Sequence, residues 1–160
     1  MNITYHPIGV IHSPFNDLAS MPIQPTSDAS APGSIEIYAQ FVEGLKDLDG
    51  FSHLILLYHL HKVRDAALTV TPFLDSVPRG IFATRAPARP NPIGLSVVNL
   101  VRIEGPILYV ADLDVLNGTP LLDLKPYVPA FDHNPVVKTG WLEEVQGSMK
   151  AKVSDGRFSY

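Results

Sequence analysis

Alternating apolar and polar residues in the first half of the chain predict three β-strands. The first spans Ile3–Ser13 and ends before Pro14, because proline has no backbone N–H to give to a sheet. In Ser34–Phe41 every second residue is apolar, which is the period of a half-buried strand. Ser52–His61 is almost continuously apolar, as expected of a buried strand. One face of this third strand is predicted to carry His53, Ile55, Leu57, His59 and His61.

The second half of the chain shows the same kind of pattern. Arg79–Arg85 alternates, Ile93–Ile103 is apolar and β-branched, and Ile107–Val115 alternates again. The pair Asn117-Gly118 predicts a turn after the last of these strands. One face of that strand would carry Ile107, Tyr109, Ala111, Leu113 and Val115, and the other would present Asp112 and Asp114 together.

The rest of the chain indicates little helix. Leu45 and Leu48 predict about one helical turn, and the 15 prolines and 11 glycines argue against a helical bundle. Four further segments are expected to be the long connections Asp17–Gly33 and Val63–Val77, the extended or looped Asp123–Pro135, and a closing strand at Met149–Val153. With 160 residues, we predict one mainly β domain, a single closed or nearly closed β-barrel with long connecting loops and few short helices.

Composition narrows the classes of function. The net charge of −4 leaves no global polycation to bind nucleic acid. Cysteine is absent, which excludes disulfides, thiolate zinc sites and cysteine nucleophiles. The first residues lack a basic segment followed by a long apolar one, and the apolar stretch Leu54–Leu60 is too short to span a bilayer. We therefore expect a cytoplasmic protein with no membrane association.

The segment Arg79–Ser96, RGIFATRAPARPNPIGLS, is the first candidate for chemistry. Arg79, Arg85 and Arg89 form a local positive patch with no acidic residue among them. The prolines that flank Arg89 and Asn91 hold both residues extended, which lowers the entropy lost when they bind a ligand. The alternative is a rigid connection between strands with solvated arginines.

The segment Leu113–Pro129, LDVLNGTPLLDLKPYVP, is the second candidate. Asp114 and Asp123 lie on either side of the Asn117-Gly118 turn, and Asp112 directly precedes the segment. Lys125 follows Asp123 by two residues. A carboxylate here could accept hydrogen bonds from a substrate, act as a base, or form ion pairs with the arginine segment. Backbone amides at the turn offer further ligand contacts.

The histidines raise the question of a metal. His59 and His61 would lie on one strand face, as in a metal-dependent hydrolase, but HExxH and an evident third ligand are missing, so no metal is expected. A role for His61 in hydrogen bonding or stacking fits better. GxGxxG, GxxxxGK[ST] and GxSxG are also absent, which leaves Rossmann, P-loop and α/β-hydrolase chemistry without support.

Four stretches of the chain resemble the tRNA threonylcarbamoyladenosine N(6)-methyltransferase family, also called the TsaA/TrmO-like family: IGVIHSPF, FSHLILLYHLH, GIFATRAPARPNPIGLS and LDVLNGTPLLDLKPY. The resemblance covers nearly the whole chain. It implies a homodimeric enzyme that binds S-adenosylmethionine on a β-barrel, near the subunit interface. It further implies methylation of N(6) of the threonylcarbamoyl-modified adenosine 3′ of the anticodon, position 37 of tRNA.

The resemblance also places the cofactor on particular residues. Expected contacts with S-adenosylmethionine are Ile23, Gln24, Pro25, His61, Lys62, Arg85, Leu95, Gly118, Thr119, Pro120 and Leu121. We expect Arg79 and Arg89 to contact tRNA phosphates. Because the acceptor nitrogen is poorly nucleophilic and must lose its proton, Asp123 is the candidate general base, with Asn91 and Lys125 orienting the substrate.

Two features depart from the family pattern. Asn117 stands where the family usually has Asp, and the additional C-terminal domain of several bacterial relatives is missing, so residues 1–160 are expected to be a single domain. The alternative function is a non-catalytic RNA- or nucleotide-binding β-barrel module, which the three arginines would also explain.

Overall fold

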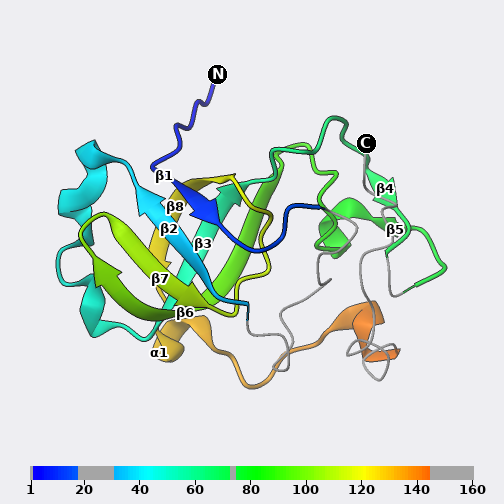
Figure 1. Cartoon of the computed structure of the whole chain (residues 1–160). Coiled ribbons are helices and arrows are strands. Elements are labelled where there is room, and N and C mark those ends of the chain that lie inside the picture. The colour runs from blue at the N-terminus through cyan, green and yellow to red at the C-terminus, as the bar shows by residue number, and fades with distance from the viewer. Residues whose placement is uncertain (1, 18–30, 73–74, 145–160) are drawn as a thin grey trace.

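The computed structural model describes residues 2–17, 31–72 and 75–144, and most of the regular structure is one closed β-barrel (Figure 1). Its strands are β1 (Gly9–His12), β2 (Gly33–Ile37), β3 (His53–His59), β6 (Ile93–Glu104), β7 (Ile107–Ala111) and β8 (Thr119–Pro126). They close in the order β1-β2-β7-β6-β3-β8, with antiparallel pairing throughout. The prediction of a mainly β, closed barrel is confirmed.

Smaller elements lie between and beyond the barrel strands. β4 (Thr69–Val70) and β5 (Arg79–Gly80) pair as a separate two-stranded sheet, seen at the right of Figure 1. The short helices are η2 (Ala39–Leu45), η3 (Leu48–Gly50), η4 (Ile81–Ala83), α1 (Pro129–Asp132) and η5 (Gly140–Glu144). In the described ranges, no helix has the length and apolar character needed to cross a membrane.

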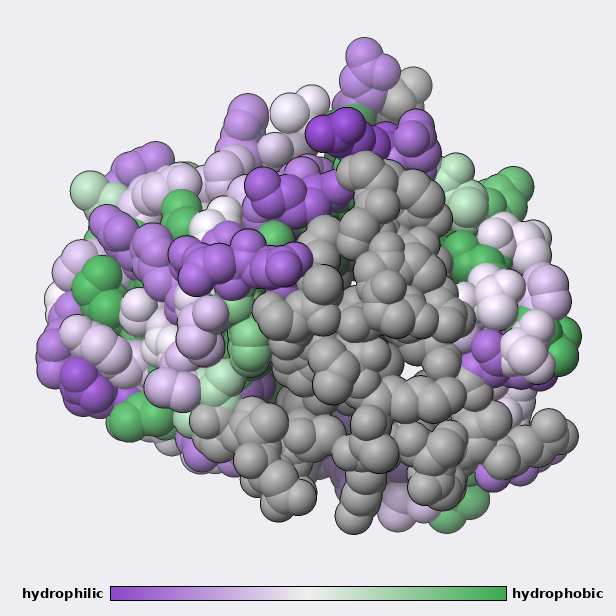
Figure 2. All heavy atoms as spheres, turned by 45° about the vertical axis from the view of Figure 1, so that its right-hand side comes forward, coloured by the Kyte–Doolittle hydropathy of each residue, from purple (hydrophilic) through white to green (hydrophobic). Residues whose placement is uncertain are grey.

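The interior of the barrel is filled by alternate residues of its strands. The side chains that are at most 2% exposed include Ile11, Ile35, Leu54, Leu56, Val98, Leu108, Val110 and Leu121. Burying a large aliphatic side chain contributes about 1.5–3 kcal/mol, so this interior supplies most of the apolar stabilisation. On the outside, Figure 2 shows hydrophobic side chains as separate groups among hydrophilic ones.

Three predictions in the first half of the chain need correction. β1 begins only at Gly9, and β2 ends at Ile37 because the chain turns into η2. Phe41 therefore lies on a 3₁₀ helix and is 38% exposed, rather than on an inward strand face. β3 ends at His59, so His61 follows the strand and does not share its face. The helical turn predicted around Leu45 and Leu48 is confirmed by η2 and η3.

The predicted strand Ile107–Val115 is shorter, and its faces are reversed. β7 ends at Ala111 because Asp112 adopts the left-handed region, with φ of 61°. Leu108 and Val110 point inward, whereas Ile107, Tyr109 and Ala111 are only partly buried. Beyond the break, Leu113 and Val115 are buried as predicted. Asp112 and Asp114 therefore do not project from a common strand face.

The remaining differences concern the segments around the two candidate motifs. Within the predicted strand Arg79–Arg85, only Arg79–Gly80 forms a strand, and η4 follows it directly. The strand β8 was not predicted as such, although it pairs with both β1 and β3 and includes the beginning of Asp123–Pro135. The turn at Asn117-Gly118 is confirmed, with Gly118 at φ of 76°. Residues 18–30 and the predicted strand Met149–Val153 lie outside the described residues.

Candidate functional site

Three chain segments that carry predicted site residues meet at one end of the barrel. The segment after β3 is held to the start of β6 by a hydrogen bond from the Leu60 amide to the Pro92 carbonyl, 2.8 Å. The turn before β8 is held to β1, because the Gly118 amide donates to the Ile11 carbonyl at 2.9 Å. This end of the barrel therefore places the segment following β3, the start of β6 and the turn before β8 close together.

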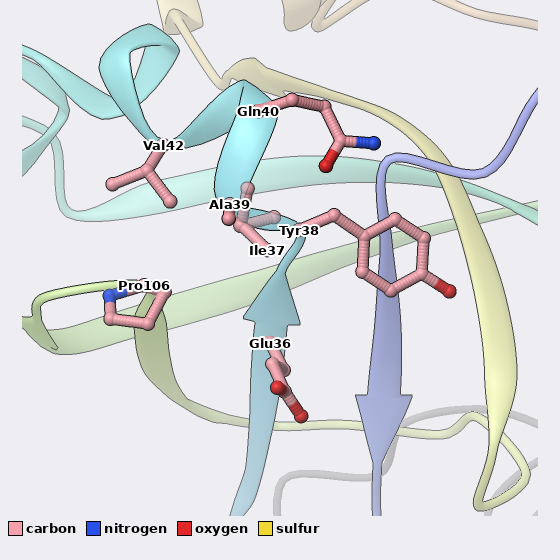
Figure 3. A pocket seen from close by; sticks show the side chains of 7 residues that line it. All are labelled: Glu36, Ile37, Tyr38, Ala39, Gln40, Val42 and Pro106. Carbon is pink, nitrogen blue, oxygen red and sulfur yellow. The ribbon is translucent and has the colours of Figure 1, made fainter.

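A different hollow lies at the opposite end. It has a volume of about 590 Å³ and lies where β2 runs into η2, with Pro106 of the β6–β7 turn on its other side (Figure 3). The Tyr38 ring points across β1 in this view. None of the predicted site residues that the structure describes lines this hollow.

A chain of three polar side chains crosses the site end of the barrel. Ser96 Oγ donates to Asp114 Oδ1 at 2.5 Å, and Tyr58 Oη lies 3.0 Å from Ser96 Oγ. A serine hydroxyl has one proton, which is used on Asp114, so Tyr58 must be the donor to Ser96. These two hydrogen bonds thus join β3, β6 and the segment that follows β7 through side chains alone.

The local backbone explains why these three side chains meet. Asn99 pairs with Ala111 at the end of the antiparallel β6–β7 ladder; Ser96 lies three residues before Asn99 in β6, and Asp114 lies three residues after Ala111, beyond the end of β7. Gly94 is paired with Tyr58 across β3 and β6, and a Cβ at Gly94 would collide with the Tyr58 ring. The glycine therefore lets the ring lie flat against β6 and direct its hydroxyl to Ser96.

Burial shifts the pKa values of the two titratable groups in this row of hydrogen-bonded side chains. Loss of solvation raises the pKa of the Asp114 carboxyl, against the opposing effects of the Ser96 hydrogen bond and the Arg85 charge. Burial and then the negative charge of Asp114 raise the pKa of Tyr58 to about 12, so its hydroxyl remains a donor. Within the described part of the chain, no cationic side chain forms an ion pair with Asp114.

His61 is held by the first residue of β8. Thr119 Oγ1 donates to the Leu116 carbonyl at 2.7 Å and lies 3.3 Å from Nδ1 of His61. The threonine proton is used on Leu116, so Nδ1 carries the proton of this contact and Nε2 of the neutral ring is an acceptor. Loss of solvation, followed by the charges of Lys62 and His59, lowers the pKa of His61. Lys62 itself is exposed.

The three predicted arginines have different surroundings. Arg79 forms an ion pair with Asp75 at 2.7 Å and lies 5.5 Å from the Trp141 ring centre. One nitrogen of Arg89, Nη1, faces three carbonyls of its own segment at 2.9–3.4 Å. Arg85 is exposed, and its charge reaches Tyr58 and Asp114. None of the four salt bridges found among the described residues joins the arginine segment to the acidic segment.

The candidate base lies on the outer surface of the barrel. Asp123 forms an ion pair with Lys125 at 2.6 Å, and their side chains are 44% and 59% exposed. Leu57 is paired with Asp123 on β8 and with Leu95 on β6, so these three residues form a row across the outer face. Asn91 is exposed in the loop before β6.

The amides of the turn do not serve the role considered for them. Gly118 N–H donates to Ile11 and Thr119 N–H to the Leu116 carbonyl, at 2.9 and 3.3 Å, so both are already used within the protein. Ligand contacts at Gly118–Leu121 would therefore come from side chains and carbonyls. Ile23, Gln24 and Pro25 lie outside the described residues. Across the described ranges, no group of three or more His, Cys, Asp or Glu is placed to hold a metal ion.

Sequence reasoning missed the roles of Tyr58, Ser96 and Trp141. Tyr58 and Ser96 lie within the quoted family stretches, but no role was assigned to either, and only the fold brings them to Asp114. Trp141 donates from Nε1 to the Ala83 carbonyl at 2.8 Å, a contact between residues 58 positions apart. No local sequence signal indicates either contact.

Fold and site together define a small closed β-barrel protein with a partly buried polar cluster at one end. Comparison with known sequences gives the family: the profile of the tRNA-methyltransferase O N-terminal domain matches residues 10–133. The chain belongs to this family. The match includes every described residue that we expected to contact the cofactor.

Individual relatives agree with this assignment. A protein from Pyrococcus abyssi named as a probable S-adenosyl-L-methionine-binding protein is 51% identical over 98% of this chain and 85% of its own length. The tRNA (adenine(37)-N6)-methyltransferase of Escherichia coli is 33% identical over 92% of this chain and 67% of its own. The crystal structure of TrmO from Pseudomonas aeruginosa superimposes with a TM-score of 0.74 and 38% identity, over 88% of this chain. The chain spans only 63% of that solved chain.

Proposed function

We propose that this protein is an S-adenosylmethionine-dependent methyltransferase that acts on N(6) of threonylcarbamoyl-modified adenosine 37 in tRNA. The observation that carries the proposal is the family match over residues 10–133, which includes both candidate segments. The names of the relatives supply the two parts of the reaction, a bound S-adenosyl-L-methionine and an adenine at position 37 of tRNA.

The side chains at the site end of the barrel suit such a cofactor. His61 offers Nε2 as an acceptor, and Lys62 and Arg85 are exposed donors. Leu95 is 48% exposed and offers apolar surface to the uncharged part of a ligand. We propose that these residues, with Gly118–Leu121 and the segment Ile23–Pro25, hold the cofactor.

The chemistry asks two things of the protein. When bound, S-adenosylmethionine supplies an electrophilic methyl group on a sulfonium, whose sulfur leaves as a neutral thioether once the methyl carbon has bonded to the acceptor nitrogen and that nitrogen has lost its proton. The protein must align the acceptor nitrogen, and alignment alone can supply effective molarities of roughly 10⁵–10⁸ M. It must also accept the proton, for which we propose Asp123, with Lys125 and Asn91 orienting the substrate.

The decisive experiment is a methylation assay with nucleoside analysis. The protein is incubated with labelled S-adenosylmethionine and with tRNA that carries or lacks the threonylcarbamoyl group, and the digested nucleosides are identified by mass. Methyl label on the modified adenosine alone supports the proposal. Cofactor binding without transfer to either tRNA would indicate a non-catalytic binding module instead. An Asp123→Asn variant that binds cofactor and methylates at the wild-type rate would remove Asp123 from the role of base.

We further propose that the protein works as a homodimer that pairs through the outer face of β3 and β6. Ile93, Leu95 and Val97 are 41%, 48% and 37% exposed there, beside the partly buried Ile55 and Leu57 of β3. Apolar residues in adjacent register across two strands are typical of a protein interface. Because Leu95 is part of this face, a partner there would border the cofactor site.

The oligomeric state tests this part separately. Sedimentation equilibrium should give a dimer mass, and Val97→Lys should shift it towards the monomer, because a buried charge opposes association. Val136→Lys is the matched control, since Val136 is 85% exposed beyond the barrel strands. A monomeric wild-type protein would contradict the dimer. A tRNA substrate would also place the protein in the cytoplasm.

A further inference from the structure

Asp114 is a carboxylate whose surroundings are incomplete. It is partly buried, at a cost in solvation that raises its pKa. A charged group so placed is normally paired with an opposite charge. Yet Asp114 forms no ion pair among the described residues, and the side chain that holds it there is the hydroxyl of Ser96.

The carboxylate is also fixed in position. Ser96 holds Oδ1 at 2.5 Å, and Tyr58 holds Ser96 at 3.0 Å, against a ring that is packed on Gly94. Three residues on two strands thus serve to hold one acid in position. A carboxylate that only filled space would not need such a support, because Asn would fill the same volume without the cost of burying a charge.

Asp114 lies among the residues proposed to hold the cofactor. Tyr58, which holds Ser96, pairs with Leu121 across β3 and β8, at the end of the barrel where Thr119 contacts His61. The charge of Arg85 reaches Asp114 without forming an ion pair with it. The acid therefore faces the same end of the barrel as the proposed cofactor contacts.

We propose that Asp114, aimed by Tyr58 and Ser96, binds a cationic group of S-adenosylmethionine. This inference rests on the proposed function. Two cations on that ligand share the required chemistry, the sulfonium and the α-ammonium. Pairing with either would supply the opposite charge that the protein itself does not provide. If the cation is the sulfonium, the attraction disappears after methyl transfer, because the product sulfur is neutral, and product release becomes easier.

The experiment is calorimetric titration of wild type and Asp114→Asn with three ligands. S-adenosylmethionine carries both cations, S-adenosylhomocysteine carries only the ammonium, and 5′-methylthioadenosine carries neither. Loss of a buried charge pair should weaken the first ligand by about tenfold or more. If the sulfonium is bound, S-adenosylhomocysteine changes by less than about twofold, and if the ammonium is bound, both charged ligands weaken together.

Controls separate this inference from the proposed function and from misfolding. Asp112→Asn removes the same charge two residues away, at a left-handed position that Asn tolerates, and should leave all three affinities unchanged. Should Asp114→Asn not fold, Ser96→Ala is the second variant, since it keeps the acid but removes the hydrogen bond that positions it. The affinities of the three ligands should then fall in the same order, by smaller factors. Equal weakening of all three ligands, or of none, overturns the inference. A wild-type protein that binds none of them overturns the proposed function instead.

Discussion

Thr119 Oγ1 lies 3.3 Å from Nδ1 of His61, so the first residue of β8 orients the imidazole that follows β3. The same hydroxyl donates to the Leu116 carbonyl at 2.7 Å and is buried. One hydroxyl thus closes the turn before β8 and selects the tautomer of His61. The turn and the histidine come from segments 58 residues apart, so the site exists only in the closed barrel.

Thr119→Val should show what the hydroxyl contributes, because it removes the hydroxyl and keeps the side-chain volume. Valine fills the same volume but removes one of the two donors to the Leu116 carbonyl, which keeps the Thr119 N–H, and we expect a loss of about 0.5–1.5 kcal/mol in the free energy of unfolding. The affinity for S-adenosylmethionine should also fall, because His61 loses its partner. Thr119→Ser keeps the hydroxyl and should restore the affinity. Urea unfolding and calorimetric titration measure the two effects, and a Val variant with wild-type affinity would contradict the orienting role.

His61 should contribute to the pH dependence of stability. Its pKa in the folded protein is lowered from 6.5, mainly by loss of solvation. The unfolded chain therefore binds the proton more readily, and the free energy of unfolding should fall as the pH drops through 6.5. In His61→Gln this part of the decrease should be absent. Urea unfolding at about pH 7.5 and pH 5.5 tests it, because equal pH dependence in both proteins would exclude His61 as a source.

The sequence predicted the barrel because its strands alternate or form apolar runs. Register, however, depends on single backbone events that a pattern does not show. Asp112 enters the left-handed region and ends β7, which reverses the faces predicted for Ile107 and Tyr109. β8 escaped prediction because Pro120 and Pro126 interrupt its pattern, although they lie at its second and last positions.

The candidate site was predictable only where a motif marked it. The resemblance pointed to His61 and Thr119, which the structure brings into contact. It assigned no role to Tyr58 or Ser96, although both lie in the quoted stretches, because their contact with Asp114 depends on how the strands pair. Arg89 illustrates the opposite case. Its positive charge and the prolines on either side of it suggested a ligand contact. The structure adds a second role, since Nη1 donates to carbonyls of its own loop.

Asp114→Asn should make the protein more stable at neutral pH while weakening cofactor binding. The raised pKa of Asp114 means that its ionised form is less favourable in the folded state than in the unfolded chain. That cost is present at neutral pH. It begins to decrease when the pH falls below the raised pKa of Asp114 in the folded protein, and it is gone once the pH is below the pKa of Asp114 in the unfolded chain. Asn removes the charge and still accepts the Ser96 hydroxyl. Thermal unfolding at several pH values should show an advantage for the variant at pH 7 that is lost in acid, and a lower Tm at pH 7 would contradict it.

Gly94→Ala should disturb the site from the side of Tyr58. A methyl group at Gly94 would collide with the Tyr58 ring, which is buried and must shift. Overpacking of this kind costs typically about 1–3 kcal/mol, and it would also pull Tyr58 from Ser96. Gly44→Ala is the control, because a Cβ there meets nothing within 4 Å. Urea unfolding should show a loss for Gly94→Ala alone, and equal stability of the two variants would show that the ring has room to move.

Arg89→Ala should reveal whether the arginine loop contacts tRNA. Nη1 of Arg89 is used on the carbonyls of Ile81, Thr84 and Ala86, while among the described residues none accepts a hydrogen bond from its Nε or Nη2, which we expect to bind a phosphate. The variant should therefore lose some thermal stability and also bind tRNA more weakly. If Arg89 neutralises one phosphate, the slope of log affinity against log salt should decrease by about 0.9, using the duplex coefficient.

Arg102→Ala is the matched control, because Arg102 pairs with Glu104 and lies 3.6 Å from the Tyr109 ring centre on the outside of the barrel. Filter binding at several salt concentrations, well below the Tm of each variant, measures the slopes. An unchanged slope in Arg89→Ala would limit this residue to holding its own loop.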